Sequence, residues 1–395
     1  MTRGRRWVIL AVGTFAQAAA TCFIFGVPML VPAFRDAGLS LFACSLLVSA
    51  PVFGQFFGLI PWGAAADRHG ERIVIVLGVG LGAVIVFGAS FVRSPTVLGG
   101  LFVIAGGCAA SVNAASGRVV MGWFPADERG LAMGVRQTAQ PIGVGLAALG
   151  LPGLGKAYGP YEALIYPALM CALAVVLVQA LVIDPPRPAR AAGAAPPLSP
   201  YRGSHQLLRI HLASTCLVVP QFAIATFTLV YLVGQRHWDA SVAGRMIFGF
   251  TVAGALGRVA SGVWSDRVGS RLRPMRQLAV CSAAILLALG IGAAARSWFV
   301  IVAFAIGSVV TVADNGLAYT SVAEIAGSEW SGRALGVQNT FQGIGAVATA
   351  PVLAAIIGDG RYALGFVLVA VVALIAVPLT PVRGERDFAA APVST

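Results

Sequence analysis

The stretch GAAADRHGER at residues 63–72 returns 199 positions later as GVWSDRVGSR at residues 262–271, with five of ten residues identical. A second pair, residues 132–143 and 334–345, lies 202 positions apart and shares seven of twelve residues. Both offsets are about half of the 395-residue chain. The sequence therefore predicts two parallel repeats, each half a chain long.

Composition indicates the solvent in which these repeats fold. Apolar residues make up 58% of the chain and charged residues only 11%, whereas soluble proteins carry about 25% charged residues. So few charges cannot cover a soluble surface, so we expect an all-α integral membrane protein in a lipid bilayer. The net charge of +12 comes as short clusters between apolar stretches, which excludes a nucleic-acid partner.

Twelve apolar stretches are long enough to cross a bilayer. They cover residues 7–34, 42–66, 73–92, 95–123, 131–155, 160–183, 208–234, 240–264, 274–294, 297–326, 334–358 and 361–380. We therefore expect an N-terminal six-helix bundle at 1–183, a central loop at 184–207, a C-terminal six-helix bundle at 208–382 and a disordered tail at 383–395.

Arginine and lysine are distributed unevenly between the two sets of loops. With both termini on one side, that side holds seventeen basic residues and the opposite side seven, and three more lie within spans. By the positive-inside rule the termini and the central loop are cytoplasmic. We expect a monomer in the cytoplasmic (plasma) membrane.

The doubled motif GxxxDRxGxR, after the second and the eighth span, resembles the signature loop of the major facilitator superfamily. The resemblance covers essentially the whole chain. It implies twelve transmembrane helices in two bundles that alternate between inward-open and outward-open states. It also implies transport of a small-molecule solute, driven by a proton or a counter-substrate.

We assign the repeated loop to a conformational switch. Small residues at 63 and 262 permit close helix contact, and those at 70 and 269 permit a tight turn. Carboxylates at 67 and 266 can pair with arginine or face a helix N-terminus; the alternative is that the motif only braces a loop. The predicted switch comprises Gly63, Asp67, Arg68, Gly70, Arg72, Arg118, Arg129, Gly262, Asp266, Arg267, Gly269 and Arg271.

The repeat also separates scaffold residues from residues with another purpose. Arg258 lies within a span and matches Leu59 in the first half, so the fold does not require a charge there. The stretch 257–267 is similar to the eighth helix of the anion-handling branches, which include monocarboxylate, oxalate/formate and nitrate/nitrite proteins. The first span, with Gln17, Gly26, Pro28 and Pro32, and the run 123–130 are similar to cyanate-permease-like proteins. The resemblance of the stretch 257–267 implies that Arg258 holds a substrate anion, for which a guanidinium is suited. Leu59 counts against nitrate, and a structural pair of Arg258 with Asp314 is the alternative.

Arg118 and Arg136 match Thr320 and Gln338, so neither belongs to the repeated scaffold. Arg118 lies near the level of Asp67, which favours a salt bridge that closes the gate. For Arg136 two interpretations stay open: a member of that network, or part of a substrate-anion vestibule.

Asp314 is an acid well inside a span, where a charge is costly. It matches Val112, whereas Asn315 matches Asn113 as a symmetric pair. In the superfamily that the chain resembles, this position lines the cavity, so we place Asn113 and Asn315 at the substrate site. We expect Asp314 to carry the coupling proton; the alternative is a charge partner for a buried arginine.

The leading interpretation is a secondary transporter of a small anion, with a monocarboxylate-like solute as the first candidate, by proton symport, antiport or exchange. One alternative is efflux of a drug or metabolite by proton antiport, and another is a non-transporting membrane sensor. The chain shows no enzyme constellation, and we expect no cofactor and no metal site.

Overall fold

The structure is a computed structural model that describes residues 3–185, 199–202, 204–238, 240–327, 329–358 and 360–385. Every regular element in these ranges is a helix. Much of the predicted central loop and most of the predicted tail lie outside the described residues.

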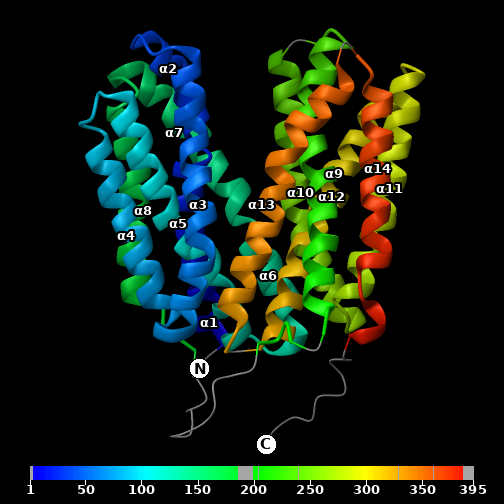
Figure 1. Ribbon diagram of the computed structural model, residues 1–395, viewed down its shortest axis with the longest axis horizontal. Coiled ribbons are helices and arrows are strands. Elements are labelled where there is room, and N and C mark those ends of the chain that lie inside the picture. Colours follow the sequence, from blue (N-terminus) through cyan, green and yellow to red (C-terminus); the bar gives the residue numbers. More distant parts are fainter. Residues whose placement is uncertain are drawn as a thin grey trace, which may run out of the picture. The chain divides into compact units, whose positions relative to one another are not determined.

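The first half of the chain forms eight α-helices and three short 3₁₀ helices (Figure 1). The α-helices are α1 (Arg3–Ile24), α2 (Val31–Asp36), α3 (Leu41–His69), α4 (Glu71–Ala89), α5 (Pro95–Trp123), α6 (Arg129–Gln137), α7 (Ala139–Tyr158) and α8 (Ile165–Leu181). The 3₁₀ helices are η1 (Val27–Leu30), η2 (Ala126–Glu128) and η3 (Glu162–Leu164).

The second half is more regular. Its six α-helices are α9 (Gln206–Gly234), α10 (Ala240–Val268), α11 (Leu272–Ala294), α12 (Phe299–Ala326), α13 (Ser331–Ile357) and α14 (Tyr362–Leu379), followed by η4 (Val382–Gly384). Across the described part of the chain, eleven helices are long and apolar enough to cross a membrane. The predicted helical membrane fold is confirmed.

The first predicted span is not one helix. Helix α1 ends at Ile24, and the 3₁₀ helix η1 and the short α2 complete the stretch. Pro28 and Pro32 are the second residues of these two elements, where proline is tolerated because the N–H it lacks has no intrahelical acceptor in the first turn. Pro28 and Pro32 therefore lie where the first span changes from one helical segment to the next.

The fifth predicted span is also divided, at Thr138 between α6 and α7. Four residues after Gln137 stands Pro141, which has no N–H to donate to the Gln137 carbonyl. Helix α13 has Gly343 at the matching position and is continuous. The proline thus explains why the two repeats differ here.

The chain forms two compact units. The described residues among Met1–Phe124, Thr138–Pro197 and Ala326–Asn339 form unit 1, and those among Pro125–Gln137, Leu198–Ile325 and Thr340–Thr395 form unit 2. Unit 1 therefore includes the start of α13, and unit 2 includes α6. The first half of the chain thus contributes the whole of α6 to unit 2, and the second half contributes the N-terminal part of α13 to unit 1.

Each unit has its own apolar core. In unit 1, Phe23 on α1 meets Phe102 on α5 edge to face, with ring centroids 5.4 Å apart. In unit 2, Phe304 on α12 meets Phe366 on α14 in the same way at 5.7 Å. These buried contacts fix the helices that present the polar groups described next.

Candidate functional site

In unit 1, the carboxylate of Asp67 at the end of α3 caps the N-terminus of α13. Its Oδ1 accepts the Gly332 N–H at 2.9 Å, and its Oδ2 accepts the Arg333 N–H at 3.1 Å. The Arg333 Nε donates to the same Oδ2 at 2.8 Å. The first amides of a helix lack intrahelical acceptors and carry partial positive charge, so a buried carboxylate is stabilised there.

Arg118 joins this carboxylate from α5. Its Nη1 lies 2.8 Å from Asp67 Oδ1, and its Nε lies 2.8 Å from Glu71 Oε1. The three side chains are at most 6% exposed. The structure therefore places Arg118 and Asp67 together, as expected, and adds Glu71, which the sequence analysis had not singled out.

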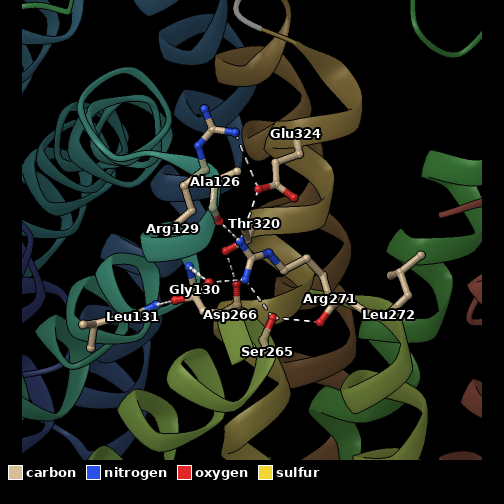
Figure 2. Close-up of polar contacts among 12 residues, drawn as sticks. Ala126, Arg129, Gly130, Leu131, Ser265, Asp266, Arg271, Leu272, Thr320 and Glu324 are labelled. Atoms are coloured by element: carbon tan, nitrogen blue, oxygen red, sulfur yellow. Dashed lines mark hydrogen bonds and ion pairs between the residues drawn. The ribbon is translucent and has the colours of Figure 1, made fainter. Parts of the chain in front are cut away.

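Unit 2 repeats the arrangement around Asp266 (Figure 2). This carboxylate, at the end of α10, accepts the Gly130 N–H at 2.9 Å and the Leu131 N–H at 2.8 Å. Both amides belong to the first turn of α6. Asp67 and Asp266 therefore cap helices that match in the internal repeat.

The cation beside Asp266 is Arg271, which does not occupy the position in unit 2 that matches Arg118 in unit 1. Arg271 precedes α11; its Nη1 bonds to Asp266 Oδ1, and its Nη2 donates to the Ala126 carbonyl (Figure 2). Glu324 on α12 lies 3.5 Å from Arg271 Nη2 and 3.7 Å from Arg129 Nη1. Glu324 lies outside the repeated motifs, so the sequence analysis did not assign it to the switch.

Two pairs of glycines allow the capped helices to approach closely. A Cβ built on Gly63 would lie 2.5 Å from the Gly332 carbonyl oxygen. A Cβ built on Gly262 would collide with the carbonyl of Gly130. These positions agree with the close contact expected at both glycines.

Two further carboxylates cap the helices that follow the motif. Asp184, after α8, accepts the Arg72 N–H at 2.7 Å at the start of α4. Glu385, after α14, accepts the N–H groups of Arg271 and Leu272 at the start of α11. The two acids lie 201 positions apart, so the half-chain offset was the signal that could have found them.

Four further residues of the predicted switch lie in or next to the two motif loops, between α3 and α4 and between α10 and α11. Gly70 and Gly269 have φ values of 103° and 66°, the region that favours glycine. Arg68 and Arg267 are exposed at the ends of α3 and α10.

A second polar group lies deeper in unit 2. Arg258 on α10 is 6% exposed and donates from Nη1 to the Gln137 carbonyl at 3.1 Å. Arg136 on α6 is 1% exposed, and its Cζ lies 5.5 Å from the ring centroid of Tyr319 on α12. Tyr319, which the sequence analysis did not single out, lies beside a predicted substrate cation.

Asp314 on α12 is 2% exposed, and its Oδ2 has no hydrogen-bond partner among the described residues. No ion pair within 4 Å joins it to Arg258, although both residues are described. The two charges nevertheless act on each other electrostatically, so the alternative of a charge partnership between Arg258 and Asp314 stays open.

Asn315 belongs to an amide chain that links three helices of unit 2. Its Nδ2 donates to Gln221 Oε1 on α9 at 2.8 Å, and its Oδ1 accepts from Gln342 Nε2 on α13 at 3.0 Å. Tyr319 donates its hydroxyl to Gln342 Oε1 at 3.0 Å. Asn113, the match of Asn315 in the first half, is half-buried on α5 in unit 1, so one asparagine of the symmetric pair lies in each unit.

Comparisons with known proteins agree with this architecture. The family model of the Major Facilitator Superfamily matches residues 9–350 and 212–387. An uncharacterized MFS-type transporter of Mycobacterium tuberculosis strain H37Rv is 42% identical over 382 residues, 96% of this chain and 86% of that protein. A probable galactarate/D-glucarate transporter of Bacillus subtilis, GudP, is 22% identical over 354 residues, 80% of this chain and 77% of that protein.

Solved structures show the same fold at low sequence identity. The crystal structure of the transporter FucP in its outward conformation superposes with a TM-score of 0.71 at 20% identity, over 94% of this chain and 99% of that chain. With the family model matching most of the sequence and a close relative over nearly its whole length, this chain belongs to the Major Facilitator Superfamily.

Proposed function

We propose that this transporter moves a small anionic, monocarboxylate-like solute by alternating access, coupled to protons or to exchange. The observation that carries the proposal is the buried guanidinium of Arg258. Its side chain has one hydrogen-bond partner among the described residues, a neutral backbone carbonyl. A charge at the centre of a membrane helix costs about 2.5–3.5 kcal/mol on insertion scales, and a bound anion would offset that cost.

Arg136 and Tyr319 support the same proposal. A second buried cation, Arg136, lies in the same unit over the face of the Tyr319 ring. The name of the Bacillus subtilis relative refers to galactarate and D-glucarate, which are dicarboxylates, so it supports an anionic solute and not a monocarboxylate in particular. We place Arg258, Arg136 and Asn315 of unit 2 at the substrate site, with Asp314 as the group that takes up the coupling proton; Asn113 of unit 1 stays a predicted substrate residue.

We also propose that the caps at Asp67 and Asp266 form the conformational switch. Each cap holds the start of a segment that continues into the other unit: α13 passes from unit 1 into unit 2 after Asn339, and α6 in unit 2 is followed at Thr138 by the segment of unit 1 that forms α7. Breaking a cap would free that helix end. In this proposal the caps hold one conformation and open in the other.

The cellular setting follows from the charge distribution. We propose that the protein is a monomer in the cytoplasmic membrane with both termini and the central loop cytoplasmic. The excess of arginine in the loops on that side supports this orientation.

The test is anion binding to the purified protein by thermal shift, with a panel of small carboxylates and inorganic anions. We expect Arg258→Gln to weaken binding at least about thirtyfold, because truncating one partner of a buried charge pair costs about 2 kcal/mol or more. Arg258→Lys should be intermediate. Arg245→Gln, an exposed position on the same helix α10, is the control. Unchanged affinity of Arg258→Gln for every anion that binds the wild-type protein would refute the assignment.

A further inference from the structure

A cavity of about 510 Å³ opens in unit 2 where the ends of three helices meet. It lies beside the first turn of α9, the second turn of α11 and the segment from the end of α14 into η4. Arg209, Arg276 and Arg383 line it, together with His205, Val377 and Pro378. This cavity contains none of the residues assigned above to the substrate site or to the switch.

The cavity concentrates positive charge. Arg209 is fixed in place, because its Nη2 donates to the Pro378 carbonyl at 2.7 Å and its Nε to the Leu379 carbonyl at 3.2 Å. The side chains of Arg276 and Arg383 are exposed and make no ion pair with a described residue. None of the described lining residues is acidic. Three guanidinium groups around one cavity without a counter-charge favour an anion with several acceptor oxygens.

Exposed apolar side chains continue from the arginines toward the middle of the helices. Leu212 lies three residues beyond Arg209 on α9, and Val280 lies four residues beyond Arg276 on α11; they are 38% and 49% exposed. Leu374, four residues before Pro378 on α14, is 45% exposed. Residues three or four apart share one face of a helix, so an exposed apolar side chain follows the arginine on α9 and on α11, and on α14 one lies on the face of Pro378, which lines the cavity.

We propose that this cavity binds the phosphate headgroup of an anionic phospholipid, with the acyl chains along α9, α11 and α14. The arginines match the phosphate and the apolar side chains match the chains. The loops before α9 and before α11 belong to the arginine-rich side of the sequence, and basic pockets between membrane helices on that side are suited to anionic headgroups. A soluble phosphate would use the arginines but not the apolar surface.

The experiment counts lipid molecules bound to the full-length purified protein by native mass spectrometry, with phosphatidylglycerol as the probe and zwitterionic phosphatidylcholine for comparison. We expect Arg276→Gln and Arg383→Gln each to weaken phosphatidylglycerol binding about fivefold and the double variant about thirtyfold, because a basic residue near an anionic surface contributes about 1 kcal/mol. Phosphatidylcholine binding should be weaker than phosphatidylglycerol binding and unchanged in the variants.

Arg273→Gln is the matched control, because Arg273 is exposed on the same helix, three residues from Arg276, and does not line the cavity. It should change phosphatidylglycerol binding less than twofold. An equal loss in Arg273→Gln would show non-specific attraction and overturn the site. Glycerol 3-phosphate or inorganic phosphate that displaces the lipid at similar concentration would show a soluble anion site and overturn the lipid assignment. Equal melting temperatures of all variants establish that folding is retained.

Discussion

The guanidinium of Arg258 donates from Nη1 to the backbone carbonyl of Gln137 at 3.1 Å. In a continuous α-helix that carbonyl would accept the N–H of residue 141, but residue 141 is proline. Pro141 matches Gly343 in the repeat and Arg258 matches Leu59. Arg258 and Pro141 therefore both differ from their matches in the repeat. The proline leaves the Gln137 carbonyl without a backbone N–H donor, and Arg258 donates to that carbonyl instead.

Pro141→Ala should couple energetically to Arg258→Gln. Alanine restores an N–H that competes for the Gln137 carbonyl, so removing Arg258 should cost less in that background than in the wild-type protein. Residues that share a partner typically show interaction energies of about 0.5–3 kcal/mol. The measurement is the thermal midpoint of the two single variants and the double variant in detergent.

Pro152→Ala provides the control for this cycle. Pro152 lies inside the same helix α7, eleven residues further on, and it should be additive with Arg258→Gln. Additive behaviour of Pro141→Ala as well would mean that the proline does not determine the position of Arg258.

Gly262→Ala should open the cap on α6. The new methyl group would collide with the Gly130 carbonyl, and overpacking typically costs about 1–3 kcal/mol. We expect faster hydrogen exchange in a peptide over residues 129–137, because the Gly130 and Leu131 amides lose Asp266. Gly249→Ala on the same helix meets nothing within 4 Å and should leave that exchange unchanged. Equal exchange in both variants would argue against close packing as the basis of the cap.

The helical fold and the two capping aspartates were predictable from the sequence, because both halves of the chain carry the same apolar pattern and the same motif. Apolar length predicted the helices, and the identical motifs predicted Asp67 and Asp266. Glu324 and Arg333 lie outside the repeated motifs, and their matches, Gly122 and Leu131, carry no charge, so the repeated motifs that identified the switch did not include them. The division of α6 from α7 was missed because the apolar pattern runs through Thr138, while the break depends on one absent N–H at Pro141.

Exchanging the charges of Asp67 and Arg118 should not restore activity lost in the single variants. For an isolated ion pair, Asp67→Arg with Arg118→Asp would recover some transport. Asp67, however, also accepts the Gly332 and Arg333 amides at the N-terminus of α13, where a cation is repelled. Asp67→Asn keeps an acceptor oxygen and should retain more transport than the exchange variant. Transport by proteoliposomes, normalised to incorporated protein, measures both; recovery by the exchange would show that the pair matters more than the cap.

Glu385→Gln should loosen the start of α11. The carboxylate accepts two backbone N–H groups there, and a neutral amide interacts less well with the positive end of a helix. Loss of a helix cap typically costs about 1 kcal/mol, which should appear as faster hydrogen exchange in residues 271–276. Asp184→Asn should produce the same effect at residues 71–76 of α4 and not at α11. Exchange that rises at both sites in either variant would indicate general destabilisation instead.

Asp314→Asn should separate two kinds of transport. The buried Oδ2 has no hydrogen-bond partner among the described residues, and a carboxyl group can take up and release a proton. Asparagine has nearly the same shape but cannot do this. Proteoliposomes of the variant should therefore lose accumulation driven by a pH gradient but retain exchange of labelled solute against unlabelled solute. Asp36→Asn, at an exposed acid of α2, should retain both. If Asp314→Asn keeps gradient-driven accumulation, another group carries the proton; if it also loses exchange, Asp314 is needed for the conformational cycle itself.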